Sequence, residues 1–205
     1  MSGRPYPKDI DPQSQCRLPL PRRDGLDAEG QRIYDSLADS RGGSLRGLRG
    51  PGGIHLHSPG LARHTRRLNH YLRQEAGLGG RARELAILVT ARELDSQFEW
   101  AAHEAEALRE GLSPKIIETI RHRRDTDGLD EADAAVIELG REIFTARKVS
   151  SSTFARALAL FGRRKLIDVV ALMGNYAATA AMLTAFDMQL DPGQPPPLPP
   201  LPPRS

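Results

Sequence analysis

The stretch RELAILVTARELDSQFEWAAHEAEALREG, residues 83–111, is the part of the chain around which the rest is organised. Its apolar residues recur at helical spacing and predict two helical segments that meet near Asp95 and Ser96. The same stretch contains Glu84, Glu99 and His103, whose side chains are suited to acid–base chemistry. The sequence therefore predicts a helix pair that carries the most reactive groups of the chain.

Glu99 and His103 lie four residues apart, so on a helix their side chains share one face within hydrogen-bonding reach. A carboxylate that accepts one imidazole N–H fixes the tautomer and leaves the other ring nitrogen free for proton transfer. We therefore expect Glu99 to orient His103. The same spacing is also common on solvent-exposed helix faces, and spacing alone does not decide between the two.

The apolar stripe of the second helix leaves His103 on another side. The stripe consists of Phe98, Ala101, Ala102, Ala105, Leu108 and Leu112. Either His103 faces water or a second surface covers it. The large indole of Trp100 flanks His103, which favours a covering helix or a partner subunit.

Glu84 lies on the apolar face of the first helix. It shares that face with Ile87, Leu88 and Ala91, so we expect it to be at least partly buried. A buried carboxylate needs a partner or a raised pKa. We predict that Glu84 approaches His103 directly or through one water, and that burial raises the pKa of Glu84.

Three motifs carry a family resemblance: E-L-A-I-L at 84–88, D-S-x-F-E-W-A-A-H-E at 95–104 and G-L-S at 111–113. They resemble the carboxymuconolactone decarboxylase family, which includes the alkylhydroperoxidase AhpD-like proteins, over residues 22–187. Redox members have Glu, eleven residues, Cys, two residues, Cys, three residues and His. Aligned on His103, their proton-relay Glu falls on Glu84, whereas Ser96 and Glu99 replace the two cysteines.

The missing thiols decide the chemistry that the resemblance implies. Thiol-dependent peroxide reduction needs one thiolate to be oxidised and a second thiol to resolve it. The E-W-x-x-H pattern resembles the decarboxylase branch, which implies a cofactor-independent lyase or isomerase of aromatic compound catabolism. Such an enzyme would act on a carboxylated lactone or aromatic-derived compound through His103, Glu84 and Glu99. The alternative is a non-catalytic or binding member that keeps the architecture.

The candidate substrate-binding residues are Trp100, Ser96, His57 and Arg92. In the family, the helix that follows His57 helps to form the pocket wall. Arginines such as Arg92 could attract a carboxylated small-molecule substrate, although a solvated basic face is the alternative. His55, His57 and His103 could in principle bind a metal, but two histidines in a loop are weak grounds, and we predict no metal and no cofactor.

The totals of the chain exclude several classes of protein. With 205 residues and 39% apolar residues, one helical domain with a sizeable core is expected. The 29 basic and 26 acidic residues nearly balance, which argues against nucleic-acid binding. Cys16 is the only cysteine, so no intrachain disulfide can form. Without an apolar signal segment or a run of about 18 apolar residues, we expect a soluble cytoplasmic protein that does not bind membranes.

Proline positions set the predicted boundaries. Five of the 16 prolines precede residue 22, and eight follow residue 191. We therefore expect an extended segment at 1–21, a helical domain at 22–188 and a proline-rich tail at 189–205. The tail favours polyproline II, should be disordered and should bury little surface, although it could also be a ligand for a proline-recognising module.

No alternating strand pattern occurs, so the prediction is an all-α bundle of the AhpD-like type with about six to eight helices. The predicted helix N-caps are Asp27, Ser58, Ser113, Asp130 and Ser152 or Thr153. The glycine- and arginine-rich stretch 41–53 is expected to be a flexible connection. The helix predicted at 162–188 is apolar on nearly every side, which, like the family resemblance, predicts a homo-oligomer, a trimer or hexamer.

Overall fold

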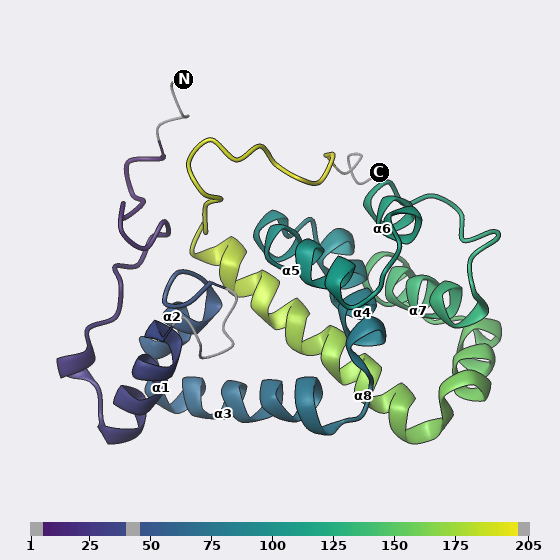
Figure 1. The fold of residues 1–205 in the computed structure, drawn as a ribbon, viewed down its shortest axis with the longest axis horizontal. Helices are drawn as coiled ribbons and strands as arrows, with labels where there is room; N and C mark the ends of the chain where they lie inside the picture. The colour runs from purple at the N-terminus through teal and green to yellow at the C-terminus, as the bar shows by residue number, and fades with distance from the viewer. Residues whose placement is uncertain (1–5, 40–45, 201–205) are drawn as a thin grey trace. The chain divides into compact units, whose positions relative to one another are not determined.

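A computed structural model describes residues 6–39 and 46–200, and these residues form helices and connecting segments without a strand (Figure 1). The helices are η1 (Arg23–Gly25), α1 (Ala28–Ala38), α2 (Pro51–Leu56), α3 (Pro59–His70), η2 (Tyr71–Glu75), α4 (Gly80–Glu93), α5 (Gln97–Arg109), α6 (Pro114–Arg121), α7 (Glu131–Arg141), η3 (Glu142–Ala146) and α8 (Ser151–Ala185). The predicted all-α class is confirmed, and the eight α-helices of the described residues agree with the predicted six to eight; η1 is a short 3₁₀ helix, and η2 and η3 are short π-helices.

Local capping chemistry explains where several helices begin. Asp27 accepts a hydrogen bond from the Gly30 amide at 2.7 Å, and Ser113 and Asp130 cap α6 and α7 in the same way. α8 differs from the expectation. Its cap is Ser150, whose Oγ accepts from the Thr153 amide at 3.2 Å, instead of Ser152 or Thr153.

The chain divides into two compact units, which are described separately. The first unit comprises residues up to His70 together with 181–195, and the second comprises 71–180 together with the chain from Pro196 onward. In the first unit, α1, α2 and α3 pack around a small core of Ile33, Leu37, Leu56 and Ala62.

α2 is an element that the sequence did not predict. Residues 40–45 of the expected flexible connection lie outside the described residues, but α2 begins at Pro51, directly after Gly50. Gly50 has a φ of 127°, a conformation that favours glycine. Ile54 and Leu56 are buried, so packing of these two side chains stabilises a helix in a segment whose composition predicts a loop.

α4 is the central helix of the second unit. Every residue from Glu84 to Glu93 is buried, because α4 packs against α5, α6 and α7. The approach of α7 is especially close: a Cβ atom on Gly140 would lie 2.4 Å from Cγ1 of Val89. A helix that is covered on all sides places Glu84 in the interior of the unit.

α8 is interrupted at Gly162, where φ is 69° and ψ is 169°, as the predicted start of a new helix at this residue implies. In the second unit, α8 contributes Leu172, Met173 and Tyr176 to the core. α8 is long and apolar enough to cross a membrane by length and composition, a weak indication that core helices of soluble proteins also give.

The proline-rich tail departs from the prediction at its described end. The side chain of Leu198 belongs to the main core of the second unit and is 2% exposed. The expectation that the tail buries little surface is therefore wrong at this residue. A leucine among prolines supplies an apolar anchor, but the surface that receives it is built by distant segments and cannot be read from the tail itself.

Candidate active site

Glu84 from α4 and His103 from α5 form a direct, buried contact. Oε2 of Glu84 lies 2.7 Å from Nδ1 of His103, and the two residues are 0% and 5% exposed. The direct approach predicted for this pair is confirmed. His103 is covered by side chains of its own chain. Of the two alternatives, exposure to water or cover by a second surface, the structure shows the second.

Two arginines also surround Glu84. Arg83 Nε lies 3.0 Å from Glu84 Oε1, and Arg73 Nη2 lies 3.7 Å from the same oxygen. Arg83 also donates to Glu110 Oε1 at 3.1 Å. The Glu84 carboxylate therefore faces the imidazole with one oxygen and two guanidinium groups with the other.

The surroundings of Glu84 set the direction of its pKa shift. Burial by itself raises the pKa, but the hydrogen bond and charge of His103, together with Arg73 and Arg83, outweigh burial and lower the pKa of Glu84. The predicted rise in the pKa of Glu84 was wrong, because the helical pattern around Glu84 does not reveal that two arginines contact its carboxylate. An ionised Glu84 only accepts hydrogen bonds, so Nδ1 of His103 donates to it, and the form of the ring that can act as a base is the tautomer with its lone pair on Nε2.

Glu99 lies beside the other ring nitrogen. Its Oε2 is 3.7 Å from Nε2 of His103, which is too long for a hydrogen bond. Burial raises the pKa of Glu99, and the opposing charges of His103 and Arg73 do not cancel this effect. The geometry thus exchanges the two expected roles: Glu84 orients His103, and Glu99 is the carboxyl group whose pKa is raised.

Tyr176 from α8 completes the cluster. Its ring meets the His103 ring edge to face, with centroids 5.2 Å apart and an interplanar angle of 85°. Arg73 Nη1 donates to the Tyr176 hydroxyl at 2.6 Å. Burial raises the pKa of Tyr176 far above its usual value, so the phenol keeps its own proton as a hydrogen-bond donor.

Arg73 and Tyr176 are site residues that the sequence did not predict. Tyr176 carried a signal, because it is a polar residue on an otherwise apolar helix. Arg73 was one of several arginines in a basic stretch, and nothing in the sequence separated it from its neighbours. We call Arg73, Glu84, Glu99, His103 and Tyr176 the His103 cluster.

Trp100, Ser96 and Arg92 make other contacts. Trp100 is fully buried, and its Nε1 donates to Glu104 Oε2 at 2.9 Å. Ser96 is buried at the start of α5, where its carbonyl accepts from the Trp100 amide at 3.0 Å. Arg92 donates to the Pro199 carbonyl at 2.9 Å. Substrate binding by these three residues stays a prediction.

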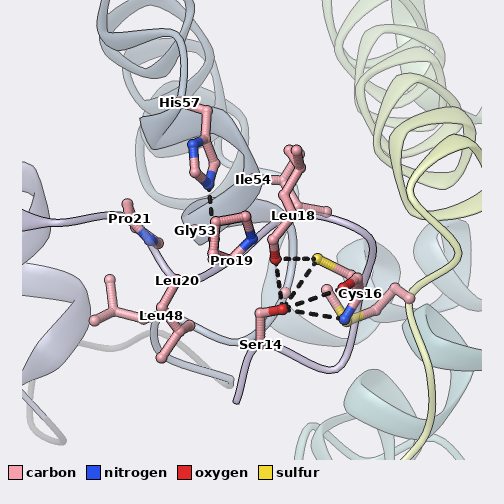
Figure 2. A pocket seen from close by; sticks show the side chains of 12 residues that line it. Ser14, Cys16, Leu18, Pro19, Leu20, Pro21, Leu48, Gly53, Ile54 and His57 are labelled. Atoms are coloured by element: carbon pink, nitrogen blue, oxygen red, sulfur yellow. Dashed lines mark hydrogen bonds between the residues drawn. The ribbon is translucent and has the colours of Figure 1, made fainter. Parts of the chain in front are cut away.

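His57 belongs to the first unit, where it lines a small pocket with Ser14 and Cys16 (Figure 2). His57 Nε2 lies 2.9 Å from the Pro19 carbonyl, and Cys16 Sγ lies 3.3 Å from the Leu18 carbonyl. The empty volume of about 180 Å³ includes open solvent, and ligand pockets usually measure about 300–1,000 Å³. Within residues 6–39 and 46–200, no group of three His, Cys, Asp or Glu side chains could hold a metal ion.

The model of the carboxymuconolactone decarboxylase family matches residues 59–139, a range that contains Glu84, Glu99 and His103. Over these residues the chain is similar to the carboxymuconolactone decarboxylase family. The match covers α3 to α6 and most of α7, so it contains Glu84, Glu99 and His103 of the helix pair, whereas Tyr176 on α8 lies outside it.

Two solved structures have a fold similar to that of this chain. An alkylhydroperoxidase AhpD core protein from Ralstonia eutropha, an uncharacterized peroxidase-related protein, has a TM-score of 0.70 and 14% identity over 85% of this chain and 92% of its own. A protein of unknown function from Agrobacterium tumefaciens, proposed to be the antioxidant defence protein AhpD, has a TM-score of 0.56 and 18% identity over 66% and 93%. A comparison with curated proteins gave no significant match.

Proposed function

We propose that the protein is a cofactor-independent lyase or isomerase that moves protons on a carboxylated lactone or a related aromatic-derived compound. The observation that carries this proposal is the buried imidazole of His103, which is held at Nδ1 by Glu84 at 2.7 Å and faces Glu99 with Nε2 at 3.7 Å. One ring nitrogen is thus fixed, and the other lies next to a second proton carrier.

The two carboxyl groups divide the proton transfer between them. In an isomerisation, Nε2 of His103 takes a proton from the carbon beside the substrate carbonyl, and Glu84 stabilises the imidazolium ion that forms. The O–H of Glu99 then breaks to protonate the product carbon. The imidazolium proton returns to the Glu99 carboxylate, which restores both groups. In a decarboxylation, departure of CO₂ leaves an electron pair on carbon, and the Glu99 proton supplies the new C–H bond.

Arg73 and Tyr176 supply the binding groups in this proposal. A guanidinium group and a phenol O–H are suited to a substrate carboxylate and to the negative charge that develops on a carbonyl oxygen. The two side chains are hydrogen-bonded to each other at 2.6 Å over the His103 ring. A substrate would replace this hydrogen bond with its own oxygen atoms.

One observation favours a second function, that of a non-catalytic or binding member of the family. His103, Glu99 and Tyr176 are each less than a tenth exposed, so the cluster could equally serve to stabilise the helix packing. The two functions differ in one respect. A catalyst must turn over a substrate in a manner that depends on His103, whereas a structural cluster affects only stability.

Thiol-based hydroperoxide reduction is not supported by the residues present. Ser96 and Glu99 stand where redox members have cysteines, and Cys16 lies in the other unit with Sγ directed to a backbone carbonyl. We expect a panel of carboxylated lactones to give turnover that is lost in His103→Ala. Hydroperoxide turnover with a dithiol reductant that Cys16→Ser abolishes would overturn this assignment.

We also propose a homo-oligomer, a trimer or hexamer, in the cytoplasm. The support is the exposed apolar side chains of α8: Ile167 is 67% exposed and Val170 is 40% exposed. We expect neither nucleic acid nor a membrane as a partner. Light scattering that gives a stable monomer at micromolar concentration would contradict the oligomer.

A further inference from the structure

The segment Pro197–Leu198–Pro199 lies on a surface formed by three helices of the second unit. Arg92 at the end of α4, Gln97 at the start of α5 and Arg121 at the end of α6 all contact it. The Leu198 side chain, 2% exposed, joins the core cluster that contains Trp100 and Ile120. We call Arg92, Gln97 and Arg121 the tail-binding surface.

The tail-binding surface satisfies every main-chain polar group of the segment. Arg121 Nη1 donates to the Pro197 carbonyl at 2.8 Å, and Arg92 Nη1 donates to the Pro199 carbonyl at 2.9 Å. Gln97 pairs with Leu198 in both directions: its Oε1 accepts from the Leu198 amide at 2.9 Å, and its Nε2 donates to the Leu198 carbonyl at 3.3 Å. Leu198 provides the sole backbone N–H of residues 195–200, because the other five are prolines.

The donors of this surface are held in place by their own partners. Arg121 pairs with Glu104 and with Glu118, and its guanidinium carbon lies 5.2 Å from the centroid of the Trp100 ring. Glu104 in turn accepts from Trp100 Nε1 at 2.9 Å. The surface is therefore fixed by side chains of the helices themselves, and binding a peptide on it requires little further ordering.

Arg92 is the most buried donor of the tail-binding surface that carries a charge. Its side chain is 3% exposed, and its Nη1 lies 3.3 Å from Asp95 and 2.9 Å from the Pro199 carbonyl. The Pro199 carbonyl therefore accepts from a guanidinium group that the folded chain, with its tail in place, shields from water, and Asp95 is the second partner of the same nitrogen. This contact also gives Arg92 a partner other than the substrate that the sequence predicted.

A proline-rich peptide offers the groups that the tail-binding surface contacts. Their carbonyl groups are free, their prolines limit the entropy lost on binding, and an apolar residue between prolines supplies the anchor. Here the chain bends at Pro197 and Leu198, which departs from the straight polyproline II helix expected for the tail. The bend accompanies burial of the Leu198 side chain while three consecutive carbonyls meet three donors.

We propose that the tail-binding surface is a recognition site for a neutral Pro-Leu-Pro peptide. The protein's own residues 197–199 occupy the site, and the same segment on a separate chain binds there when the tail is displaced. A tethered tail competes at an effective concentration on the order of millimolar, so the site is closed to weaker ligands in the intact chain.

The test uses the full chain with Leu198→Lys, which places a charge beside Arg92 and Arg121 and releases the tail. A fluorescein-labelled peptide with the sequence of residues 192–200, PGQPPPLPP, is titrated and followed by anisotropy. We expect saturable binding to this variant and at least tenfold weaker binding to the unmodified chain, because the tethered tail competes. The matched peptide with lysine in place of leucine should not bind. Adding Arg92→Gln to the variant should weaken binding about tenfold.

Absence of saturable binding up to about 1 mM, with the circular dichroism of the variant unchanged, would show intramolecular packing only and overturn the proposal. A second measurement applies if Leu198→Lys does not fold. Hydrogen exchange of the Leu198 amide in the unmodified chain should be slow, and millimolar unlabelled peptide should accelerate it by displacing the tail. Exchange that peptide leaves unchanged would also contradict the proposal.

Discussion

The two units each hold a histidine within hydrogen-bonding distance of an oxygen, and the two oxygens differ in kind. In the second unit, His103 faces the ionised Glu84 carboxylate, with Arg73 and Arg83 behind it and Glu99 at the far nitrogen. In the first unit, His57 faces the backbone carbonyl of Pro19. Only the carboxylate beside His103 can stabilise an imidazolium ion by charge. Proximity to an oxygen alone therefore does not make a histidine an acid–base group.

The largest expected effect is on turnover. General acid–base catalysis contributes about 100-fold to 10,000-fold, so His103→Ala and Glu84→Gln should each lower kcat on that scale. Cys16→Ser, which changes the pocket of the first unit, should leave kcat within about twofold. Rates measured on any lactone that the wild-type protein converts provide the check. Loss of activity in Cys16→Ser would contradict the assignment of catalysis to the His103 cluster and place it in the first unit.

The next effect is on stability. Glu84→Ala leaves Arg73 and Arg83 without their shared carboxylate, and breaking a buried ion pair on one side costs about 3–5 kcal/mol. Because the pKa of Glu84 is lowered in the folded protein, its stabilising contribution is present above the pKa of the unfolded chain and is lost as pH falls through the folded value. Urea denaturation should therefore show a deficit for Glu84→Ala that is large at pH 7 and shrinks in acid.

Glu99 should show the opposite dependence on pH. Its pKa is raised in the folded protein, so the wild-type chain loses stability as pH rises from the unfolded value through the folded value. Glu99→Gln removes this loss. The variant should gain stability relative to wild type as pH rises above 4.5, the ordinary pKa of a glutamate, in the same denaturation experiment. A deficit that grows with pH would mean that Glu99 is ionised and paired.

The smallest effect belongs to His57. Its hydrogen bond to the Pro19 carbonyl is exposed, and a hydrogen bond in a protein contributes about 0.5–1.5 kcal/mol. His57→Ala should lower the free energy of unfolding by about 1 kcal/mol. Thermal denaturation of His57→Ala and of Glu84→Ala compares the two sites directly. Equal losses in the free energy of unfolding would mean that the charge of Glu84 adds no stability.

The sequence predicted what depends on short-range spacing. Helix caps such as Asp27, the break at Gly162 and the burial of Glu84 follow from local patterns, and the structure has all three. The approach of Glu84 to His103 could also be predicted, because a short turn brings the two helices together.

What the sequence could not provide depends on contacts between distant segments. Arg73 of η2 contacts Tyr176 of α8, and these residues are far apart in the sequence. The direction of the Glu84 pKa shift likewise depends on side chains of η2, α4 and α5 that meet only in the folded chain. The receiving surface for Leu198 has the same origin, since Arg92, Gln97 and Arg121 come from three different helices.

The state of the His103 ring tests the central claim without knowledge of the substrate. Long-range ¹H–¹⁵N NMR spectra distinguish the two ring nitrogens of a neutral imidazole. We predict that Nδ1 carries the proton and Nε2 the lone pair, and that Glu84→Gln weakens this preference while Glu99→Gln preserves it. A neutral His103 protonated at Nε2 in the wild-type protein would contradict the assignment of Glu84 as the orienting group and of Nε2 as the base.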